Sequence, residues 1–360
     1  MSANLSIISG YVYDDHVSVS ITSRNLYGRK TYCRYYDCRR NELPNPYESK
    51  VFPESTIYCP RRRGAEFISL SHELTEKAQP MVKLTNRLGS YKHYFAVCLA
   101  PFHGKEPKWL GIIEFIEYYK LMGATMFYLY VKHVDDYTKT ILDDYVRTGE
   151  IELTVLHDVY WKPEWIWHMP TVLDCHQRSK NHAKWTASVD LDEKIMMNET
   201  GPYKTITDYL KTVEDPNIVS LDFRVQWVQK TGFMPEKFIN ESQVVSELEF
   251  NKYHLTTTKI APRGIQQKCI VRSDKIGSNF IHFPTPLYPG TRAEVVSPRT
   301  AYVRHYRQKK DGTFVEEVKK MMKYGPFVNT TIEPKLAKKW TEAVLERAKF
   351  VYEMAPLPSK

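Results

Sequence analysis

The sequence predicts a mixed α/β protein, in which a Rossmann-like, mostly parallel sheet flanked by helices over residues 93–352 follows a β-rich subdomain over residues 1–92. Three observations support this fold class. Strands and helices alternate strictly from residue 93 to residue 189, short strands and turns fill the first 92 residues, and 42% of the 360 residues are hydrophobic. A chain of this length and composition can bury a large core, which excludes disorder as its main state.

The N-terminal subdomain is predicted from short runs of β-branched and aromatic residues. These runs occupy residues 11–13, 17–21 and 31–36, and turns rich in Asp, Asn, Gly and Pro separate them. Three cysteines lie in the same subdomain, namely Cys33, Cys38 and Cys59. Because small, loop-rich modules often depend on disulfides, the clustering of cysteines here is consistent with such a module.

The next segment predicts a parallel, right-handed sheet. Its predicted strands are residues 94–99, 126–131, 151–156 and 185–189. Its predicted helices are residues 109–122, 138–148 and 171–182. Gly123 and Gly149 end the first two helices, and Pro170 begins the third. Strand–helix alternation of this kind is typical of a doubly covered sheet.

The order of elements is looser beyond residue 200. Residues 218–227 alternate between apolar and polar side chains, which predicts one half-buried strand, and residues 268–272 predict another. Residues 314–322 and 336–351 predict amphipathic helices, and residues 353–360 predict a loose tail. The sequence contains no internal repeat.

The charge of the chain bears on its partners. A net charge of +9 favours anionic partners such as nucleic acid, phosphorylated metabolites or acidic membranes. The basic residues are scattered, however, and Arg61-Arg62-Arg63 is the only dense run, so a mixed, solvated surface is the simpler interpretation. Because the sequence has no RNA-binding or helix-turn-helix motif, we expect no nucleic-acid partner.

The cysteines and the N-glycosylation sequons bear on the compartment. The sequence has no apolar run of about 18 residues and no signal peptide at its N-terminus. The number of cysteines is even, at six, and N-x-S/T sequons occur at Asn4, Asn198, Asn240 and Asn329. Both features favour the secretory lumen and at least two disulfides, with a cytosolic protein as the alternative.

The most informative stretch is the Asp-x-Asp motif of Asp190 and Asp192, which directly follows the predicted strand at residues 185–189. In an open α/β sheet, ligands bind just beyond the carboxyl ends of the strands. Two carboxylates placed there offer hard oxygen ligands to Mg²⁺ or Mn²⁺, and such an ion neutralises a diphosphate leaving group. A turn with capping aspartates is the alternative interpretation.

The sequence lacks the motifs of several other kinds of nucleotide-binding and catalytic site. No G-x-G-x-x-G follows the first strand of the α/β part and no G-x-x-x-x-G-K-[ST] occurs, which disfavours dinucleotide and P-loop sites. The G-x-S-x-G motif of the α/β-hydrolases is also absent.

Five stretches together carry a family resemblance. They are EFIEYYKLMGATMFYLYV (residues 114–131), WH (167–168) leading to DCHQR (174–178), KWTASVDLDEKI (184–195), QKCIVRSDKI (267–276) and RHYR (304–307). In order and spacing they resemble glycosyltransferase family 92, formerly domain of unknown function 23, and in particular its nematode β-galactosyltransferases.

The resemblance implies a GT-A fold and an inverting, metal-dependent hexosyltransferase with Mn²⁺ or Mg²⁺ as cofactor. Relatives transfer galactose from UDP-galactose to a glycan hydroxyl such as the core fucose of N-glycans. Such enzymes are type II membrane proteins of the Golgi, so the resemblance implies a lumenal protein whose membrane anchor is absent from this sequence.

The resemblance also implies roles for residues of a metal site. Asp190 is expected towards the ribose and the metal, and Asp192 is expected to bind the metal directly. A histidine late in the chain commonly completes the site in GT-A enzymes. We expect it to be His305 in RHYR, with His282 in IHFP as the alternative, and either histidine could instead belong to the core or to an acceptor site.

Nucleotide-binding residues follow in the same way. Those expected to hold the uracil are Ala96, Val97, Cys98 and Leu99, with simple core packing as the alternative. Lys268 or Arg307 is a candidate for contacting the diphosphate, although surface charge is the simpler interpretation of both.

An inverting reaction needs a general base that takes the proton of the acceptor hydroxyl. The sequence does not choose among three candidates, Asp222, Glu241 and Glu247. Candidates for stacking on acceptor sugars are Trp161, Trp165 and Trp167, with core packing as an equal alternative. The alternative function for the whole chain is a catalytically silent, carbohydrate-binding relative.

Overall fold

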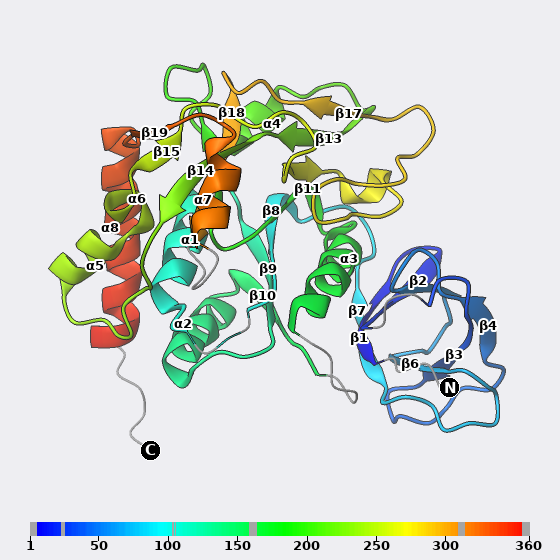
Figure 1. The fold of residues 1–360 in the computed structure, drawn as a ribbon. Helices are drawn as coiled ribbons and strands as arrows, with labels where there is room; N and C mark the ends of the chain where they lie inside the picture. The colour runs from blue at the N-terminus through cyan, green and yellow to red at the C-terminus, as the bar shows by residue number, and fades with distance from the viewer. Residues whose placement is uncertain are drawn as a thin grey trace.

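The computed structural model describes residues 6–22, 26–102, 104, 106–157, 164–308 and 314–354. Figure 1 shows two parts, a smaller all-β domain at the N-terminus and a larger α/β domain beside it. No helix within the described ranges is both long enough and apolar enough to cross a membrane.

The N-terminal domain is a single curled sheet with the strand order β4-β3-β6-β7-β1-β2-β5. Its strands are β1 (Ile7–Val12), β2 (His16–Ile21), β3 (Lys30–Tyr36), β4 (Tyr47–Lys50), β5 (Thr56–Pro60), β6 (Phe67–Ser71) and β7 (Val82–Asn86). The two outer strands meet, because Ser49 donates a hydrogen bond to the carbonyl of Tyr58 at 2.6 Å. We call this domain the N-terminal barrel.

The core of the α/β domain is a second seven-stranded sheet with the order β10-β9-β8-β11-β16-β13-β17. Its strands are β8 (His93–Leu99), β9 (Met126–Val131), β10 (Ile151–Val155), β11 (Ala183–Val189), β13 (Ile218–Phe223), β16 (Lys268–Val271) and β17 (Arg292–Val295). The first four are parallel to one another, and β16 is antiparallel to β11. The chain order therefore reverses between β8 and β11, and ligands of open α/β sheets bind at such a switch point.

Helices cover both faces of this sheet, as the sequence predicted. α1 (Trp109–Leu121) and α2 (Asp136–Arg147) pack on one face together with α8 (Pro334–Lys349). α3 (His168–Ser179) covers the other face and lies between the central strands and the barrel (Figure 1). This arrangement is the expected GT-A type of α/β fold.

A third, five-stranded sheet extends the α/β domain in the order β12-β18-β14-β15-β19. Its strands are β12 (Glu193–Met197), β14 (Val225–Lys230), β15 (Leu255–Thr257), β18 (Ala301–Gln308) and β19 (Phe327–Asn329). The remaining helices are α4 (Ile206–Lys211), α5 (Glu241–Glu247), α6 (Glu249–Lys252) and α7 (Phe314–Met322), with single turns at Glu164–Trp167, Ser273–Lys275 and Phe350–Met354.

Two sequence predictions about these elements were wrong. The single strand predicted over residues 218–227 is two strands, because the chain leaves the second sheet after β13 and enters the third sheet at β14, with a break at Arg224. The third helix begins at His168 rather than at residue 171, because the preceding turn Glu164–Trp167 leads directly into it. Most of the predicted tail, from residue 355, lies outside the described residues.

The two domains meet through a buried polar cluster. The carboxylate of Asp174 on α3 accepts hydrogen bonds from the hydroxyls of Tyr11 (3.0 Å) and Tyr130 (2.6 Å). Arg178, one turn further along the helix, donates to the Tyr11 hydroxyl at 2.8 Å. A buried polar group that loses its hydrogen-bond partner destabilises the folded state. This cluster therefore holds the barrel against α3.

The prediction of at least two disulfides is confirmed. Cys33 pairs with Cys59 inside the barrel, and Cys98 at the end of β8 pairs with Cys175 on α3. The second bond closes a loop with a sequence separation of 77 residues and ties α3 to the central sheet. Cys38 is free and exposed, and Cys269 is free and buried.

Candidate active site

The Asp-x-Asp motif lies in the tight turn between β11 and β12. The backbone N–H of Glu193 donates to the carbonyl of Asp190 at 3.0 Å, and the N–H of Asp190 donates to the Glu193 carboxylate at 2.9 Å. The side chains of Asp190 and Asp192 keep 28% and 31% of their surface exposed. The turn therefore presents both carboxylates beyond the end of β11, as predicted.

Lys268 supplies the positive charge next to the carboxylates of this turn. It begins β16, next to β11, and its ammonium lies 2.9 Å from both the Asp190 and the Glu193 carboxylates while its side chain is only 1% exposed. Burial alone would raise the pKa of Asp190, but Lys268 and His168 outweigh it and hold that pKa well below its usual range. The interpretation of Lys268 as surface charge is therefore wrong.

His305, on a strand of the third sheet, lies close to the side chain of Asp192. It lies on β18 directly opposite Glu193 of β12, so its ring reaches the turn from the side. Its Nε2 lies 3.4 Å from Asp192 Oδ2, and its Nδ1 lies 3.4 Å from Glu193 Oε1. Burial alone would lower the pKa of His305, but Asp192 and Glu193 outweigh it and raise that pKa.

His168 is a site residue to which the sequence analysis gave no role. It begins α3, and its Nε2 lies 3.4 Å from Asp190 Oδ1 with 29% of the side chain exposed. Its only sequence signal was its place in the WH stretch of the family resemblance. The contact needs α3 to lie across the end of β11, which the sequence alone does not show.

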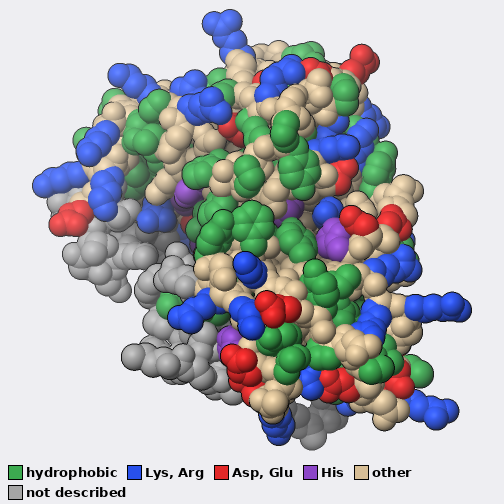
Figure 2. Space-filling model, turned by 90° about the vertical axis from the view of Figure 1, so that its right-hand side faces the viewer, with side chains coloured by type: hydrophobic (Ala, Val, Ile, Leu, Met, Phe, Trp, Pro, Cys, Tyr) green, Lys and Arg blue, Asp and Glu red, His purple; other side chains and the backbone are tan. Residues whose placement is uncertain are grey.

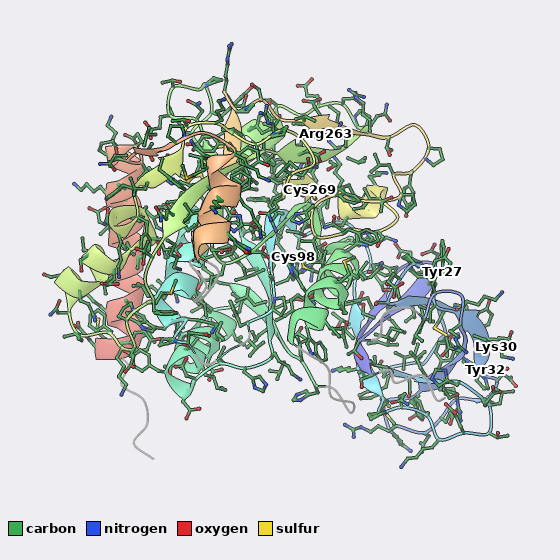
Figure 3. All side chains as sticks on the ribbon, viewed as in Figure 1. Tyr27, Lys30, Tyr32, Cys98, Arg263 and Cys269 are labelled. Carbon is green, nitrogen blue, oxygen red and sulfur yellow. A yellow bond between two sulfur atoms is a disulfide. The ribbon has the colours of Figure 1, made fainter. Side chains whose placement is uncertain are left out.

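A narrow pocket opens at the switch point between β8 and β11. It is lined by Cys98, Leu99, His168, Thr171, Asp190 and Lys268, among others. Its free volume of about 10 Å³ is far below the several hundred Å³ of typical ligand sites, so a nucleoside can enter only if the lining separates. Figure 3 shows Cys98 at the centre of the molecule, with Cys269 and Arg263 above it.

The four residues expected to hold the uracil of the nucleotide fall into two groups. Cys98 and Leu99 line the pocket, and Cys98 is part of the disulfide to Cys175. Ala96 and Val97 are fully buried in hydrophobic clusters on the two faces of the sheet, which matches the core-packing alternative.

His282 contacts a backbone carbonyl and forms no direct bond to the carboxylates of the turn among the described residues. Its Nδ1 contacts the backbone carbonyl of Gln267 at 3.0 Å, and within the described residues no hydrogen bond or ion pair joins it to Asp190 or Asp192. Burial lowers the pKa of His282. The geometry thus favours His305 over His282 as the partner of Asp192. Arg307 lies two residues after His305 on the same strand.

The three candidate bases lie in different surroundings. Asp222 on β13 is buried, accepts a hydrogen bond from Ser220 at 2.9 Å, and lies 3.3 Å from the Arg263 guanidinium. Glu241 and Glu247 lie at the two ends of α5, where they pair with Lys349 and Lys252. Among the described contacts, none links these three carboxylates to the Asp-x-Asp turn, so all three stay candidates for the general base.

The tryptophan candidates are described only in part. Trp161 and the side chain of Trp165 lie outside the described residues. Trp167 is 1% exposed within a hydrophobic cluster, and the Lys132 ammonium lies 4.7 Å from the centre of its ring. The structure therefore supports core packing for Trp167.

A second group of buried charges lies behind the turn. The Glu249 carboxylate receives the ammonium groups of Lys194 and Lys230, each at 2.6 Å, and all three side chains are at most 8% exposed. Glu114, which is fully buried, accepts a hydrogen bond from the backbone N–H of Glu249 at 3.2 Å, and its other carboxylate oxygen has no hydrogen-bond partner among the described residues. Burial and the neighbouring Glu249 raise the pKa of Glu114 to about 8.

Replacing Glu114 with Gln should therefore stabilise the fold increasingly as the pH rises. In the wild type, the folded state keeps the Glu114 proton up to about pH 8, whereas the unfolded chain loses it near pH 4.5. Because the folded state binds the extra proton, the free energy of unfolding falls as the pH rises through this window. The Gln variant lacks this loss, and we expect it to be more stable by about 1–3 kcal/mol near pH 8.

Urea denaturation near pH 5 and pH 8.5 checks this result, with Glu342→Gln on the exposed side of α8 as the matched control. The difference between Glu114→Gln and the wild type should grow between the two pH values, and the control should show no such growth. An identical pH dependence in Glu114→Gln and wild type would contradict the assignment of a neutral Glu114.

The chemistry of a metal site can be tested against these side chains. Within the described ranges, no group of three or more His, Cys, Asp and Glu side chains is arranged to hold a metal ion. Asp192 Oδ2 and His305 Nε2 are 3.4 Å apart, close to the roughly 3 Å between neighbouring ligands of an octahedral ion with bonds of about 2.1 Å. The pair fits a divalent ion as two of its ligands, with the others supplied by a bound diphosphate or water.

A match to a protein-family model shows which family the chain belongs to. The model described as glycosyltransferase family 92 matches residues 93–340, which include both aspartates, Lys268 and His305. The chain belongs to glycosyltransferase family 92. No curated protein matches the chain in sequence.

Solved structures resemble this family 92 protein only distantly. TarS (residues 1–349) from S. aureus is 11% identical, covers 73% of each chain and has a TM-score of 0.33. Its structure with UDP-GlcNAc is 12% identical, with 73% and 74% covered and a TM-score of 0.32. The mannosyltransferase PcManGT from Pyrobaculum calidifontis, in complex with GDP-Man and Mn2+, is 11% identical, with 75% and 77% covered and a TM-score of 0.31.

Proposed function

We propose that this family 92 protein is an inverting hexosyltransferase that transfers galactose from UDP-galactose to a glycan hydroxyl. One observation carries the proposal. The Asp190–Asp192 turn lies at the switch point of the central sheet, where His305, His168 and Lys268 converge on its carboxylates. A site of this polarity beyond the strand ends suits a sugar nucleotide better than an apolar ligand.

The donor is proposed to lie across this turn. The base enters the pocket beside Cys98 and Leu99, and Asp190 accepts hydrogen bonds from the ribose hydroxyls. Lys268 keeps Asp190 ionised, which makes the carboxylate a strong acceptor for those hydroxyls. The side chain of His168, on the other side of Asp190, fixes the orientation of the carboxylate.

Asp192 and His305 are the proposed ligands of Mn²⁺ or Mg²⁺. When bound, the ion offsets the negative charge that develops on the departing diphosphate. Glu193 contacts the far nitrogen of the His305 ring, so a proton on Nδ1 leaves Nε2 free to face Asp192. His305 must be neutral to act as a ligand, and loss of its proton is therefore part of metal binding.

Inversion places the acceptor on the face of the sugar opposite the diphosphate. A carboxylate on that side takes the proton of the acceptor hydroxyl, and no covalent sugar–protein intermediate forms. Asp222, Glu241 and Glu247 remain the candidates, and Asp222 is the one on a strand of the central sheet, one register pair away from Lys268.

We also propose a lumenal location in the Golgi. The two disulfides support an oxidising compartment, since such bonds rarely persist in the cytosol. The acceptor is proposed to be a glycan such as the core fucose of N-glycans.

Sugar-nucleotide turnover tests the proposal. The purified protein, with its disulfides intact, is incubated with UDP-galactose, UDP-glucose or UDP-GlcNAc, with fucosylated or unfucosylated N-glycans, and with Mn²⁺ or EDTA. Release of UDP with UDP-galactose, dependence on metal and a β-linked product by NMR are expected. An α-linked product would overturn the inverting assignment. Glycan binding without any UDP release would favour the silent, carbohydrate-binding alternative.

A further inference from the structure

A second cavity opens in the N-terminal barrel, apart from the residues of the Asp-x-Asp turn. Its volume is about 690 Å³, within the range of small-molecule sites. It is lined by the adjoining ends of β1 and β2, by the loop from Arg61 to Glu66 that joins β5 to β6, and by the end of β7. The mouth of a β-barrel is a common place for a ligand.

The cavity contains the one dense basic run of the sequence. Arg61, Arg62 and Arg63 all line it, and Glu66 is the only acidic residue among the lining side chains. No ion pair within the described residues involves any of the three arginines. Their charge is therefore not neutralised within the described part of the chain, which suits an anionic ligand.

Neutral groups hold two of these arginines in place. Arg62 donates to the backbone carbonyl of Asn45 at 2.6 Å, and its guanidinium lies 5.3 Å from the centre of the Tyr35 ring. Arg61 donates to the backbone carbonyl of Asp14 at 3.4 Å. A guanidinium has five N–H donors, so each of these side chains retains donors for a ligand.

Apolar side chains make up part of the remaining lining. Val12, Val17, Leu84 and Leu88 contribute side chains without charge, and Asn86 adds an amide. A cavity lined by both apolar side chains and arginines suits a small ring-bearing molecule with one strongly anionic substituent. Guanidinium groups bind the oxygens of sulfate and phosphate in pairs of parallel hydrogen bonds.

We propose that this cavity binds a small sulfate or phosphate ester of about monosaccharide size. The concave shape favours such a molecule over a flat, extended anionic surface. Figure 2 shows Lys and Arg side chains spread over the face it displays, among acidic and hydrophobic ones, rather than gathered in one patch. The proposal concerns the barrel alone and does not depend on the proposed transferase activity.

The barrel that contains the cavity contacts α3, the helix that carries His168 of the candidate active site. The hydroxyl of Tyr13, in the turn between β1 and β2, donates to the carbonyl of Gln177 near the end of α3, and the ammonium of Lys180 lies 4.8 Å from the Tyr13 ring. His168 begins the same helix, whose 12 residues span about 18 Å. The two sites are thus separate, and each can be disabled without altering the side chains of the other.

Calorimetry on the full chain with intact disulfides tests the proposal. The probes are galactose 6-sulfate, galactose 6-phosphate, inorganic sulfate and neutral galactose, and vesicles containing a phosphoinositide represent a lipid-linked ester. We expect both sugar esters to bind, galactose not to bind, and affinity to fall steeply with salt concentration. The double variant Arg61→Gln/Arg63→Gln should weaken ester binding by at least about tenfold.

Arg39→Gln, an exposed arginine of the same barrel outside the cavity, is the matched control and should bind as the wild type does. Asp192→Asn should also leave ester binding unchanged, which separates this test from that of the proposed function. The proposal is overturned if neither ester binds at about 10 mM, if the double variant binds as tightly as the control, or if only the vesicles bind.

Discussion

Replacing Asp192 with Asn should lower the rate of sugar transfer at least a hundredfold while leaving the fold intact. Asn has nearly the same shape as Asp but carries no charge, so the variant loses the charged one of the two proposed protein ligands. Loss of one group that stabilises charge in a transition state costs about 3–4 kcal/mol in related cases, which corresponds to a factor of about 100–1,000 in rate. Asp192 is 31% exposed, and its fold-related hydrogen bond, from the N–H of Tyr306, goes to its backbone carbonyl.

The measurement combines initial rates of UDP release with calorimetric binding of UDP in Mn²⁺ and in EDTA. Wild-type UDP affinity should fall in EDTA, and Asp192→Asn in Mn²⁺ should resemble the wild type in EDTA. Asp143→Asn on the exposed side of α2 is the matched control and should behave as the wild type does. UDP affinity that ignores both EDTA and Asp192→Asn would remove the metal from the proposal.

The sequence was sufficient to place the Asp-x-Asp turn, because local pattern decides where a buried strand ends. The apolar run before Asp190 has the length and composition of a central parallel strand, and the strand order confirms that position. The pairing of His305 with Asp192 followed from the family resemblance rather than from any local pattern, since Asp192 lies in the turn after β11 and His305 lies on β18, far along the chain.

The partners of the turn were harder to predict because they come from distant segments. Lys268 reaches Asp190 from β16, 78 residues away in sequence, and its burial depends on the antiparallel pairing of β16 with β11. A lone lysine in a sequence is usually exposed, so composition favoured the wrong interpretation. Glu193 was visible next to the motif, but its contact with His305 depends on the β12–β18 register.

The break at Arg224 was missed for a related reason. Apolar and polar residues alternate without interruption from residue 219 to residue 227. Alternation indicates which face of a strand is buried but not which sheet the strand joins. The carbonyl of Arg224 accepts a hydrogen bond from Val303 of β18, while Asp222, two residues earlier, still pairs with Cys269 of β16. Only these long-range pairings show that the chain changes sheets.

Replacing Lys268 with Met should destabilise the protein by about 3–5 kcal/mol, which is the usual cost of removing one partner from a buried ion pair. The change leaves the carboxylates of Asp190 and Glu193 side by side without their shared cation, and Glu193 is only 1% exposed. Met fills a volume similar to that of the lysine stem, so the loss reflects charge rather than a cavity.

A double variant distinguishes this electrostatic effect from simple misfolding. Removing the charge of Glu193 as well, in Lys268→Met/Glu193→Gln, should recover part of the lost stability, because the remaining Asp190 is partly exposed and can be solvated. Chemical denaturation measures all variants, with Lys338→Met on the exposed face of α8 as the control expected to lie close to the wild type. If the double variant were less stable than Lys268→Met by the full cost of a second independent change, Lys268 would act through packing and not as the counter-charge of the turn. Recovery would instead establish that the two carboxylates are held together by this one ammonium group, which keeps Asp190 ionised in the proposed donor site.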